Sequence, residues 1–353
     1  FATGGQSANG AGLKVIDLDG DGKLDVVSSI GRTAFVGSFV TFRNTSVPGT
    51  VSFDSPEQWD GLSDESPVLN VADIDGDGRP DLMGSEGSSS SVSRPYFWIA
   101  QNISTPGNVE FAASRNFDFN MFDAVSAASV GDLDGDGKPE IVVRTSFSGA
   151  FHVLQNNCTP GVLAFSHLFS VTSGIQGGVQ IADLNEDGKN DLAWKSGGTN
   201  DVVIRLNGYA GGVLSAVDFA TQVILQSDLG NYGGVSLADL NGDGRVDLAV
   251  ADNGNIGIFE NVYAGGTFDA SAFVSAYLYQ GAGNSTYPTS VISADLNGDL
   301  RPDMVAGITN TSPNRISIFE NRNVHAPVIS VNTVSPLAGP VGSTVTITGD
   351  YFS

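Results

Sequence analysis

The sequence predicts an all-β protein built from repeated units, and three observations support this prediction. A nine-residue acidic motif, first written "DLDGDGKLD", occurs six times along 353 residues. Its first aspartate falls at positions 17, 73, 132, 183, 239 and 295, so the repeats are 51 to 59 residues long. Hydrophobic and polar residues alternate between the motifs, and 45 glycines without a collagen period indicate many tight turns.

Each repeat contains four segments with the composition of β-strands. The first leads into the acidic motif, the second follows it directly, the third ends near an asparagine, and the fourth follows a Pro-Gly or Gly-Gly turn. Examples are "GVQIADL" at 178–184, "PEIVVRTSF" at 139–147, "FVTFRN" at 39–44 and "PGNVEF" at 106–111. Val, Ile and Phe at every second position, punctuated by Gly, Pro and Asn, are typical of strands.

Four short antiparallel strands in about 50–60 residues have the size of one blade of a β-propeller. We therefore predict a β-propeller of four-stranded blades, with six blades visible and a seventh if another lies upstream. A β-sandwich and a linear β-solenoid are the alternatives. Solenoid repeats are usually shorter and sandwiches are seldom internally repetitive, so the propeller is favoured.

The acidic motif predicts a calcium loop. Each copy reads D-x-[D/N]-x-D-G-x-x-[D/E], so side-chain oxygens at positions 1, 3, 5 and 9 and the carbonyl of position 7 can surround one cation. Calcium takes about six to eight oxygen ligands in flexible geometry, whereas magnesium demands a stricter octahedron. The motif contains no His or Cys, which argues against zinc. A solvated acidic turn is the alternative for a single copy, but six equivalent copies argue against it.

We expect up to six Ca²⁺ ions, with the Lys or Arg of position 7 contributing only its backbone carbonyl. Six ions would change the formal net charge from −23 to −11 and relieve a self-repulsion that opposes the compact state. Removal of calcium should then destabilise the fold. The predicted ligands are Asp17, Asp19, Asp21, Lys23 and Asp25; Asp73, Asp75, Asp77, Arg79 and Asp81; Asp132, Asp134, Asp136, Lys138 and Glu140; Asp183, Asn185, Asp187, Lys189 and Asp191; Asp239, Asn241, Asp243, Arg245 and Asp247; and Asp295, Asn297, Asp299, Arg301 and Asp303.

The six loops are not equal. Asn185, Asn241 and Asn297 replace Asp at position 3 and lower the charge of the last three loops, and Glu186 adds an acid that is not a ligand. Position 6 is Gly in five loops, where it allows a sharp bend with positive φ, but it is Leu300 in the sixth. Because a side chain in left-handed backbone costs about 1–2 kcal/mol, the sixth loop is expected to be the weakest site.

These loops resemble the FG-GAP and VCBS repeats of calcium-bearing β-propellers, whose best-known members are the heads of integrin α subunits. The resemblance covers about residues 1–323. In that family the carboxylates of positions 1, 3, 5 and 9 bind calcium, which implies this role for Asp17, Asp19, Asp21, Asp25 and their equivalents in the later loops. The phrase "NTSVPGTVSF" resembles bacterial versions in large secreted surface proteins of the Bacteroidetes type.

A change of pattern predicts a second unit after the propeller. The run "SPLAGPVGSTVTITG", within a segment that starts at Pro327, resembles the first strands of an IPT/TIG immunoglobulin-like domain. We therefore divide the chain into a propeller over 1–323 and, over 324–353, a linker with the first Ig-like strands. Such a domain needs roughly 80–100 residues, so the resemblance implies neighbouring Ig-like modules in a longer chain.

Composition and motifs argue against several functions. With 39 acidic and 16 basic residues, nucleic acid and anionic membranes are poor partners, and no apolar run is long enough for membrane insertion. No G-x-S-x-G, H-E-x-x-H or P-loop motif occurs. His152, His167, His325 and the single Cys158 are better explained as strand, linker and turn residues than as catalytic groups. We expect no enzyme; a polysaccharide-active propeller that uses paired carboxylates is the alternative.

Three functions remain open. The first is a calcium-stabilised adhesion or interaction module outside a bacterial cell, secreted or attached to its surface, with a protein or a glycan on a cell surface as partner. The second is a lectin-like propeller, in which exposed aromatic rings stack on sugars. The third is a passive spacer in a surface filament. Aromatic residues considered for sugar stacking, with packing between blades as the alternative, are Trp59, Trp98, Trp194, Tyr96, Tyr232 and Tyr287.

Overall fold

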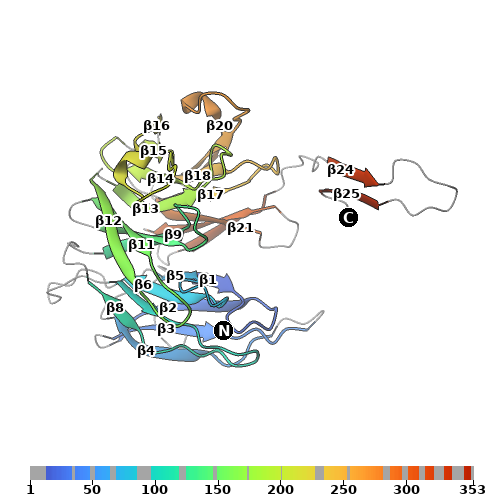
Figure 1. The fold of residues 1–353 in the computed structure, drawn as a ribbon. Coiled ribbons are helices and arrows are strands. Elements are labelled where there is room, and N and C mark those ends of the chain that lie inside the picture. Colours follow the sequence, from blue (N-terminus) through green and yellow to red (C-terminus); the bar gives the residue numbers. More distant parts are fainter. Residues whose placement is uncertain are drawn as a thin grey trace.

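The chain folds into a series of antiparallel β-sheets in the computed structural model (Figure 1). Five sheets have four strands each, a sixth has three strands within the described residues, and a seventh has two. This confirms the predicted all-β propeller of four-stranded blades. The structure describes residues 13–33, 36–47, 52–63, 69–85, 97–118, 125–145, 149–172, 175–199, 201–226, 234–252, 255–280, 287–295, 301–309, 315–321, 330–335 and 346–350.

The strands follow one another through the blades in chain order. Their bounds are β1 (Leu13–Ile16), β2 (Asp25–Thr33), β3 (Val36–Phe42), β4 (Glu57–Ser63); β5 (Leu69–Ala72), β6 (Asp81–Ser85), β7 (Phe97–Ala100), β8 (Arg115–Phe117); β9 (Val125–Gly131), β10 (Glu140–Thr145), β11 (Ala150–Asn156), β12 (Phe165–Thr172); β13 (Ile175–Ala182), β14 (Asp191–Ser196), β15 (Val202–Arg205), β16 (Gln222–Leu225); β17 (Val235–Ala238), β18 (Asp247–Asp252), β19 (Asn255–Asn261), β20 (Phe273–Gln280); β21 (Tyr287–Ala294), β22 (Asp303–Thr309), β23 (Arg315–Phe319); and β24 (Ser330–Ser335), β25 (Thr346–Asp350). Two short 3-10 helices, η1 (Ala216–Phe219) and η2 (Ala270–Ala272), precede β16 and β20.

The first strand of each blade is its innermost strand. Strands β1, β5, β9, β13, β17 and β21 contact one another in this order, so that the blades succeed each other around an arc (Figure 1). The five larger hydrophobic clusters each lie between two successive blades: Phe151 of the third blade and Trp194 of the fourth, for example, meet edge to face with ring centroids 5.4 Å apart. Because both faces of a blade are covered, β10 is buried along almost its whole length. Continuous apolar runs such as "IVV" at 141–143 follow from this burial.

The fourth strands lie later in the sequence than predicted. The segments after the Pro-Gly turns were expected to form them, but "PGNVEF" at 106–111 contributes only isolated bridges, Thr105 with Asn108 and Asn102 with Phe111. The outer strand β8 begins four residues further on, at Arg115. The Pro-Gly segment instead folds back over the end of the third strand, where Ile103 N–H donates to the Glu110 carbonyl at 2.9 Å. Among the described blades, the third is the exception: its predicted segment "PGVLAF", at 160–165, ends on the first residue of the outer strand β12, Phe165.

Strands β24 and β25 pair with each other and stand apart from the blades (Figure 1). They fall in the segment for which a second unit was predicted, and the division at residue 323 remains a prediction. The described part of the chain contains no helix with the length and hydrophobicity to span a bilayer.

Candidate metal centres

The acidic motifs form the turns between the first and second strands of the blades. Five of these loops are described in full, at 17–25, 73–81, 132–140, 183–191 and 239–247. Of the sixth, Asp295, Arg301 and Asp303 lie within the described residues, whereas Asn297, Asp299 and Leu300 lie outside them. The expectation that the sixth site is the weakest therefore stays a prediction.

The carboxylates fold the loop by accepting its backbone N–H groups. In the first loop, Asp17 Oδ1 accepts from Gly20 at 2.8 Å and Asp17 Oδ2 from Gly22 at 2.9 Å. Asp19 and Asp21 each accept from the N–H two residues further on, at 3.0 and 2.9 Å. Such Asx turns hold a tight bend without regular secondary structure. The bonds to positions 4 and 6 recur in the second, third and fifth loops.

Two places in the loop have backbone that favours glycine. Position 6 has positive φ in all five described loops, for example 83° at Gly22, as predicted. Position 4 has positive φ as well, 75° at Gly20, which the sequence analysis did not anticipate. The fourth loop has Glu186 at this position with φ of 59°, and among the described residues it is the one non-glycine with positive φ. The Glu186 side chain is exposed, and among the described hydrogen bonds of this loop none involves it.

The acid at position 9 starts the second strand and is buried. Asp25 Oδ2 accepts the N–H of Leu18 at 2.9 Å, and its Oδ1 accepts that of Asn44 at 2.8 Å. Equivalent pairs of bonds occur at Asp81, Asp191 and Asp247. The side chain therefore ties the start of the loop to the end of the third strand.

Burial raises the pKa of these acids, and the other carboxylates of the same loop add to the effect. The pKa rises to about 6 for Asp81 and Asp247 and to about 7 for Glu140 and Asp191, although backbone N–H groups oppose the shift. Burial also raises the pKa of Asp25. A cation in the loop would favour the ionised form of each acid.

In the second to sixth blades, an asparagine at the end of the third strand or just after it joins the blade to the one before. Asn102 Nδ2 donates to the carbonyl of Pro80 in its own blade at 3.0 Å and to that of Leu18 in the preceding blade at 2.8 Å. Its Oδ1 accepts the N–H of Ser104 at 2.9 Å. Bonds to the preceding loop at 2.7 or 2.8 Å recur at the other members of this set. We name these residues the clasp asparagines: Asn102, Asn156, Asn207, Asn261 and Asn321.

Each clasp asparagine binds the residue at position 2 of the preceding loop. The N–H of this position-2 residue binds the position-9 acid, its carbonyl accepts from the clasp of the next blade, and its side chain is buried between the two blades. This residue is Leu or Ile in every copy, a recurrence that the sequence analysis did not use. The five described members of the set are Leu18, Ile74, Leu133, Leu184 and Leu240.

Position 3 makes a second contact with the following blade. Asp19 Oδ2 accepts the N–H of Gly107 at 2.9 Å, and Asp75 Oδ2 accepts that of Gly161, also at 2.9 Å. Both glycines belong to Thr-Pro-Gly turns of the next blade. These turns therefore have a structural role beside the loops that was not predicted from the sequence, where they were expected only to lead into the outer strands.

The bases at position 7 contact the loop through their side chains. Arg79 pairs with Asp77 and donates from Nε to the carbonyl of Asn102 at 2.9 Å. Arg245 pairs with Asp243 and donates to the carbonyl of Asn261 at 2.8 Å. Only the carbonyls of these residues were predicted to take part in the loop, although all six loops have Lys or Arg here.

The first loop has an additional cation beside its carboxylates. Arg43 Nε donates to Asp19 Oδ2 at 2.8 Å, its Nη2 lies 3.3 Å from Asp21 Oδ2, and its Nη1 lies 3.0 Å from Asp54. Burial of Asp19 opposes its ionisation, but the hydrogen bonds from Arg43, Gly107 and Asp21 keep its pKa below the ordinary value. The equivalent residues of the second and third blades are Gln101 and Gln155, which carry no charge.

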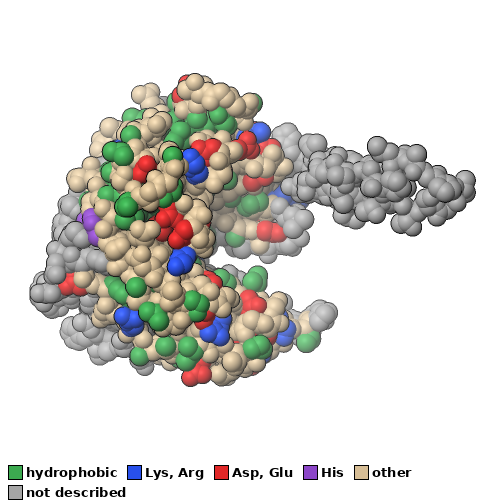
Figure 2. All heavy atoms as spheres, viewed as in Figure 1, with side chains coloured by type: hydrophobic (Ala, Val, Ile, Leu, Met, Phe, Trp, Pro, Cys, Tyr) green, Lys and Arg blue, Asp and Glu red, His purple; other side chains and the backbone are tan. Residues whose placement is uncertain are grey.

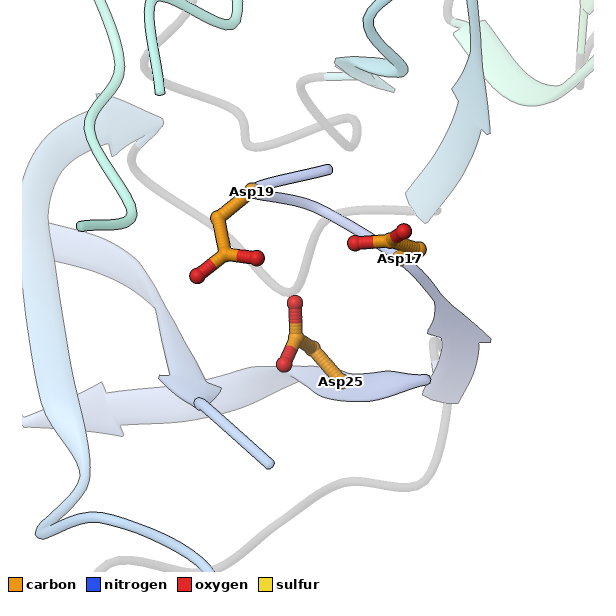
Figure 3. A group of neighbouring side chains, drawn as sticks. All are labelled: Asp17, Asp19 and Asp25. Atoms are coloured by element: carbon orange, nitrogen blue, oxygen red, sulfur yellow. The ribbon is translucent and has the colours of Figure 1, made fainter. Parts of the chain in front are cut away.

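The donor set fits a hard divalent cation. Carboxylate oxygens of Asp17, Asp19 and Asp25 lie within 4.8 Å of one another and point toward a common space (Figure 3). The equivalent group in the second loop is Asp73, Asp75 and Asp81, whereas the third loop brings together Asp132, Asp134 and Asp136, at positions 1, 3 and 5. In the third loop, Glu140 Oε1 is buried without a hydrogen bond of ordinary geometry among the described residues. A bound cation would offset the cost of this buried oxygen.

The loops with asparagine at position 3 keep an oxygen in the same place. Asn185 Oδ1 and Asn241 Oδ1 accept the N–H two residues on, at 3.1 and 2.9 Å, as the aspartates do in the other loops. Asn241 Nδ2 donates to Glu260 at 3.0 Å and to Asp243, the position-5 carboxylate of the same loop, at 3.1 Å. The substitution therefore lowers the charge of the site without removing an oxygen donor.

Two solved structures show the extent of structural similarity. A lectin from Agrocybe aegerita, described as recognising non-reducing terminal N-acetylglucosamine, is 18% identical over 88% of this chain and 80% of its own, with a TM-score of 0.51. The Photorhabdus luminescens Tc holotoxin pore is 15% identical over 88% of this chain, with a TM-score of 0.45. The chain spans only 14% of that toxin chain. No curated protein sequence matches the present chain at a significant level.

A protein-family model described as an FG-GAP-like repeat matches the sequence five times, at residues 17–84, 73–143, 132–194, 183–250 and 239–306. Each match begins at the first aspartate of one acidic loop and ends within the second strand of the next blade, so it contains two successive acidic loops and the strands between them. The chain belongs to the FG-GAP-like repeat family.

Proposed function

We propose that this propeller binds calcium through its acidic loops and that the ions hold neighbouring blades together. The recurrent oxygen donors of the loops support this proposal, because each loop gathers carboxylates that repel one another without a cation. Positions 1, 3, 5 and 9 would hold the ion. Calcium supplies positive charge there, while the position-9 acid and the clasp asparagine transmit the ordering of the loop to the next blade.

The calcium proposal is tested by thermal unfolding with and without chelator. We expect removal of calcium to lower the Tm by several degrees and isothermal titration to return several sites per chain. Asp136→Asn, which removes one charge from the third loop and keeps its size, should remove or weaken one site. An unchanged Tm together with no calcium heat would contradict the proposal.

We propose further that the propeller is a non-catalytic interaction module in adhesion, acting outside the cell in a longer modular surface protein. Its family supports an interaction role, and the IPT/TIG-like segment from Pro327 supports a chain of modules. The proposed partner is a protein or a glycan on a cell surface. A net charge of −23 disfavours nucleic acid and anionic lipid as partners.

Glycan binding is the second candidate, favoured by the structural likeness to the Agrocybe aegerita lectin. The tryptophans give it little support: Trp98 and Trp194 are fully buried in the cores between blades, and half-buried Trp59 stacks on Phe39 and donates to Thr41. Tyr96 and Tyr232, like the side chain of Tyr287, lie outside the described residues.

A binding screen separates these functions. The folded protein is applied to a glycan array and to cells, each in calcium and in chelator, with the Tm measured in both conditions. Calcium-dependent binding to defined sugars would establish the lectin-like function. Binding to cells that survives removal of their surface glycans would establish a protein partner. No binding by the folded, calcium-loaded protein would contradict an interaction role and favour the spacer.

A further inference from the structure

The third blade brings two of the three histidines of the chain to one hydroxyl group. His152 lies on β11 and His167 on the outer strand β12. His152 Nδ1 lies 2.8 Å from Ser170 Oγ, and His167 Nε2 lies 3.0 Å from the same atom. The ring centroids are 5.6 Å apart. Since hydrogen bonds to imidazole lie along the nitrogen lone pairs or N–H bonds, both rings are aimed at the same point.

A β-bulge creates this arrangement. The register of β11 and β12 pairs Val153 with Phe169 but Leu154 with His167, which leaves Leu168 as an extra residue in β12. In a regular strand, residues three apart face opposite sides of the sheet. The extra residue shifts this alternation by one, so His167 and Ser170 face the same side as His152. Bulges commonly redirect side chains at binding sites.

We propose that His152 and His167 form a binding site for a single divalent transition-metal ion of the Zn²⁺ class. Imidazole nitrogen suits ions such as Zn²⁺, Cu²⁺ and Ni²⁺, whereas the oxygen-only loops suit calcium. Two nitrogens that already converge on Ser170 Oγ need to move little to share an ion in its place. The ring that donates to Ser170 would carry its proton on the other nitrogen when the ion binds.

The surroundings suit such a site. Ser170 is exposed and His167 is partly exposed, so an ion and its remaining water ligands can enter from solvent, while His152 is only 6% exposed and held in place. Figure 2 shows histidine atoms, in purple, at the outer surface of the molecule. Burial lowers the pKa of His167, which keeps the ring neutral, as metal ligation requires.

The experiment is a titration of the full chain with ZnCl₂ in excess CaCl₂, so that calcium competes for the carboxylate loops. Wild type is expected to bind one Zn²⁺ outside those loops. His152→Asn and His167→Gln keep a polar atom near the Nδ1 and Nε2 positions and so keep the bond to Ser170. Each should weaken zinc binding about tenfold or more, the loss seen even for outer-shell partners of metal sites. His325→Ala is the matched control and should bind like wild type.

A spectroscopic measurement makes the result independent of folding effects. With one equivalent of Cu²⁺, electron paramagnetic resonance should show coupling to two imidazole nitrogens in wild type and to one in each variant. The calcium melting curve of each variant confirms that it is folded. Unchanged zinc affinity in His152→Asn and His167→Gln, or loss of binding in His325→Ala, would overturn the assignment.

Discussion

At the scale of single residues, the acidic loop depends on backbone conformation as much as on charge. Two of its nine positions have positive φ, and glycine fills both in four of the five described loops. The exception is Glu186, at position 4 of the fourth loop. Glycine at position 6 could be explained from the sequence because it occurs in five of six copies beside the predicted ligands. Position 4 is glycine equally often, in five of six copies, so the same recurrence could have predicted its positive φ as well.

Replacing Glu186 by glycine should therefore stabilise the protein. A non-glycine residue in left-handed backbone costs about 1–2 kcal/mol, so we expect Glu186→Gly to raise the free energy of unfolding by about 1 kcal/mol. The measurement is urea unfolding of the metal-free protein. The reciprocal change Gly242→Glu, at the same position of the fifth loop, should lower it by a similar amount. Equal stability of both variants and wild type would show that position 4 is not strained.

The clasp asparagines give a second prediction at this scale. Asn156→Ala removes a buried side chain and leaves the carbonyls of Ile74 and Pro139 and the N–H of Cys158 without their partner. Each such buried group costs about 1–3 kcal/mol, so a large fall in Tm is expected.

The neighbouring residue provides the control for this prediction. Asn157 is exposed, and its amide reaches only Gln155 and Ser166 within its own blade. Asn157→Ala should therefore change the Tm little. A similar effect of the two substitutions would show that the bond between blades contributes nothing.

At the scale of elements, the first loop differs from the others because Arg43 already pairs with two of its carboxylates. A guanidinium group beside Asp19 and Asp21 competes with a cation for the same oxygens. Arg43→Gln, which copies the residue of the second and third blades, should raise the calcium affinity of the first loop. Calorimetric titration would show one site strengthened and the rest unchanged. Weaker binding in the variant would mean that the arginine organises the loop for calcium.

Some strands could be predicted from the sequence and others could not. The acidic loops and the first three strands of each blade could be located because motif and alternation repeat together. The fourth strands could not, because β16 and β20 follow 3-10 helices and β8 has only three residues. The Pro-Gly segment looked like a strand, but it folds back on the third strand and places Gly107 against Asp19. That contact spans 88 residues, so no local pattern reveals it.

At the scale of the whole molecule, the buried acids should make the stability of the metal-free protein depend on pH. The pKa values of Asp81, Glu140, Asp191 and Asp247 rise to about 6 or 7, while the same groups titrate near 4 in an unfolded chain. Between these values the folded protein holds protons that the unfolded chain has lost. Its stability is therefore greatest at the acidic end of this window and falls as pH rises toward 7.

Thermal unfolding checks this sign. After removal of metal, the Tm at pH 5 should exceed the Tm at pH 7.5. Calcium should raise the Tm more at pH 7.5 than at pH 5, because fewer protons then compete with the ion. A metal-free protein that melts higher at pH 7.5 would show that these carboxylates are stabilised in their charged form by the backbone N–H groups alone.

The clasp runs in one direction along the chain, and this has a consequence for biosynthesis. Each asparagine reaches back to the loop of the blade before it, across 74 to 84 residues. During synthesis on the ribosome, the carbonyl of Leu18 can accept its hydrogen bond only after Asn102 has emerged, and that of Ile74 only after Asn156 has emerged. Each blade thus gains its clasp hydrogen bond only after the next blade has been synthesised. During translation, the blade made last therefore still lacks this bond. A stall in translation would expose that blade, and not the ones already made, to proteases and to misassembly.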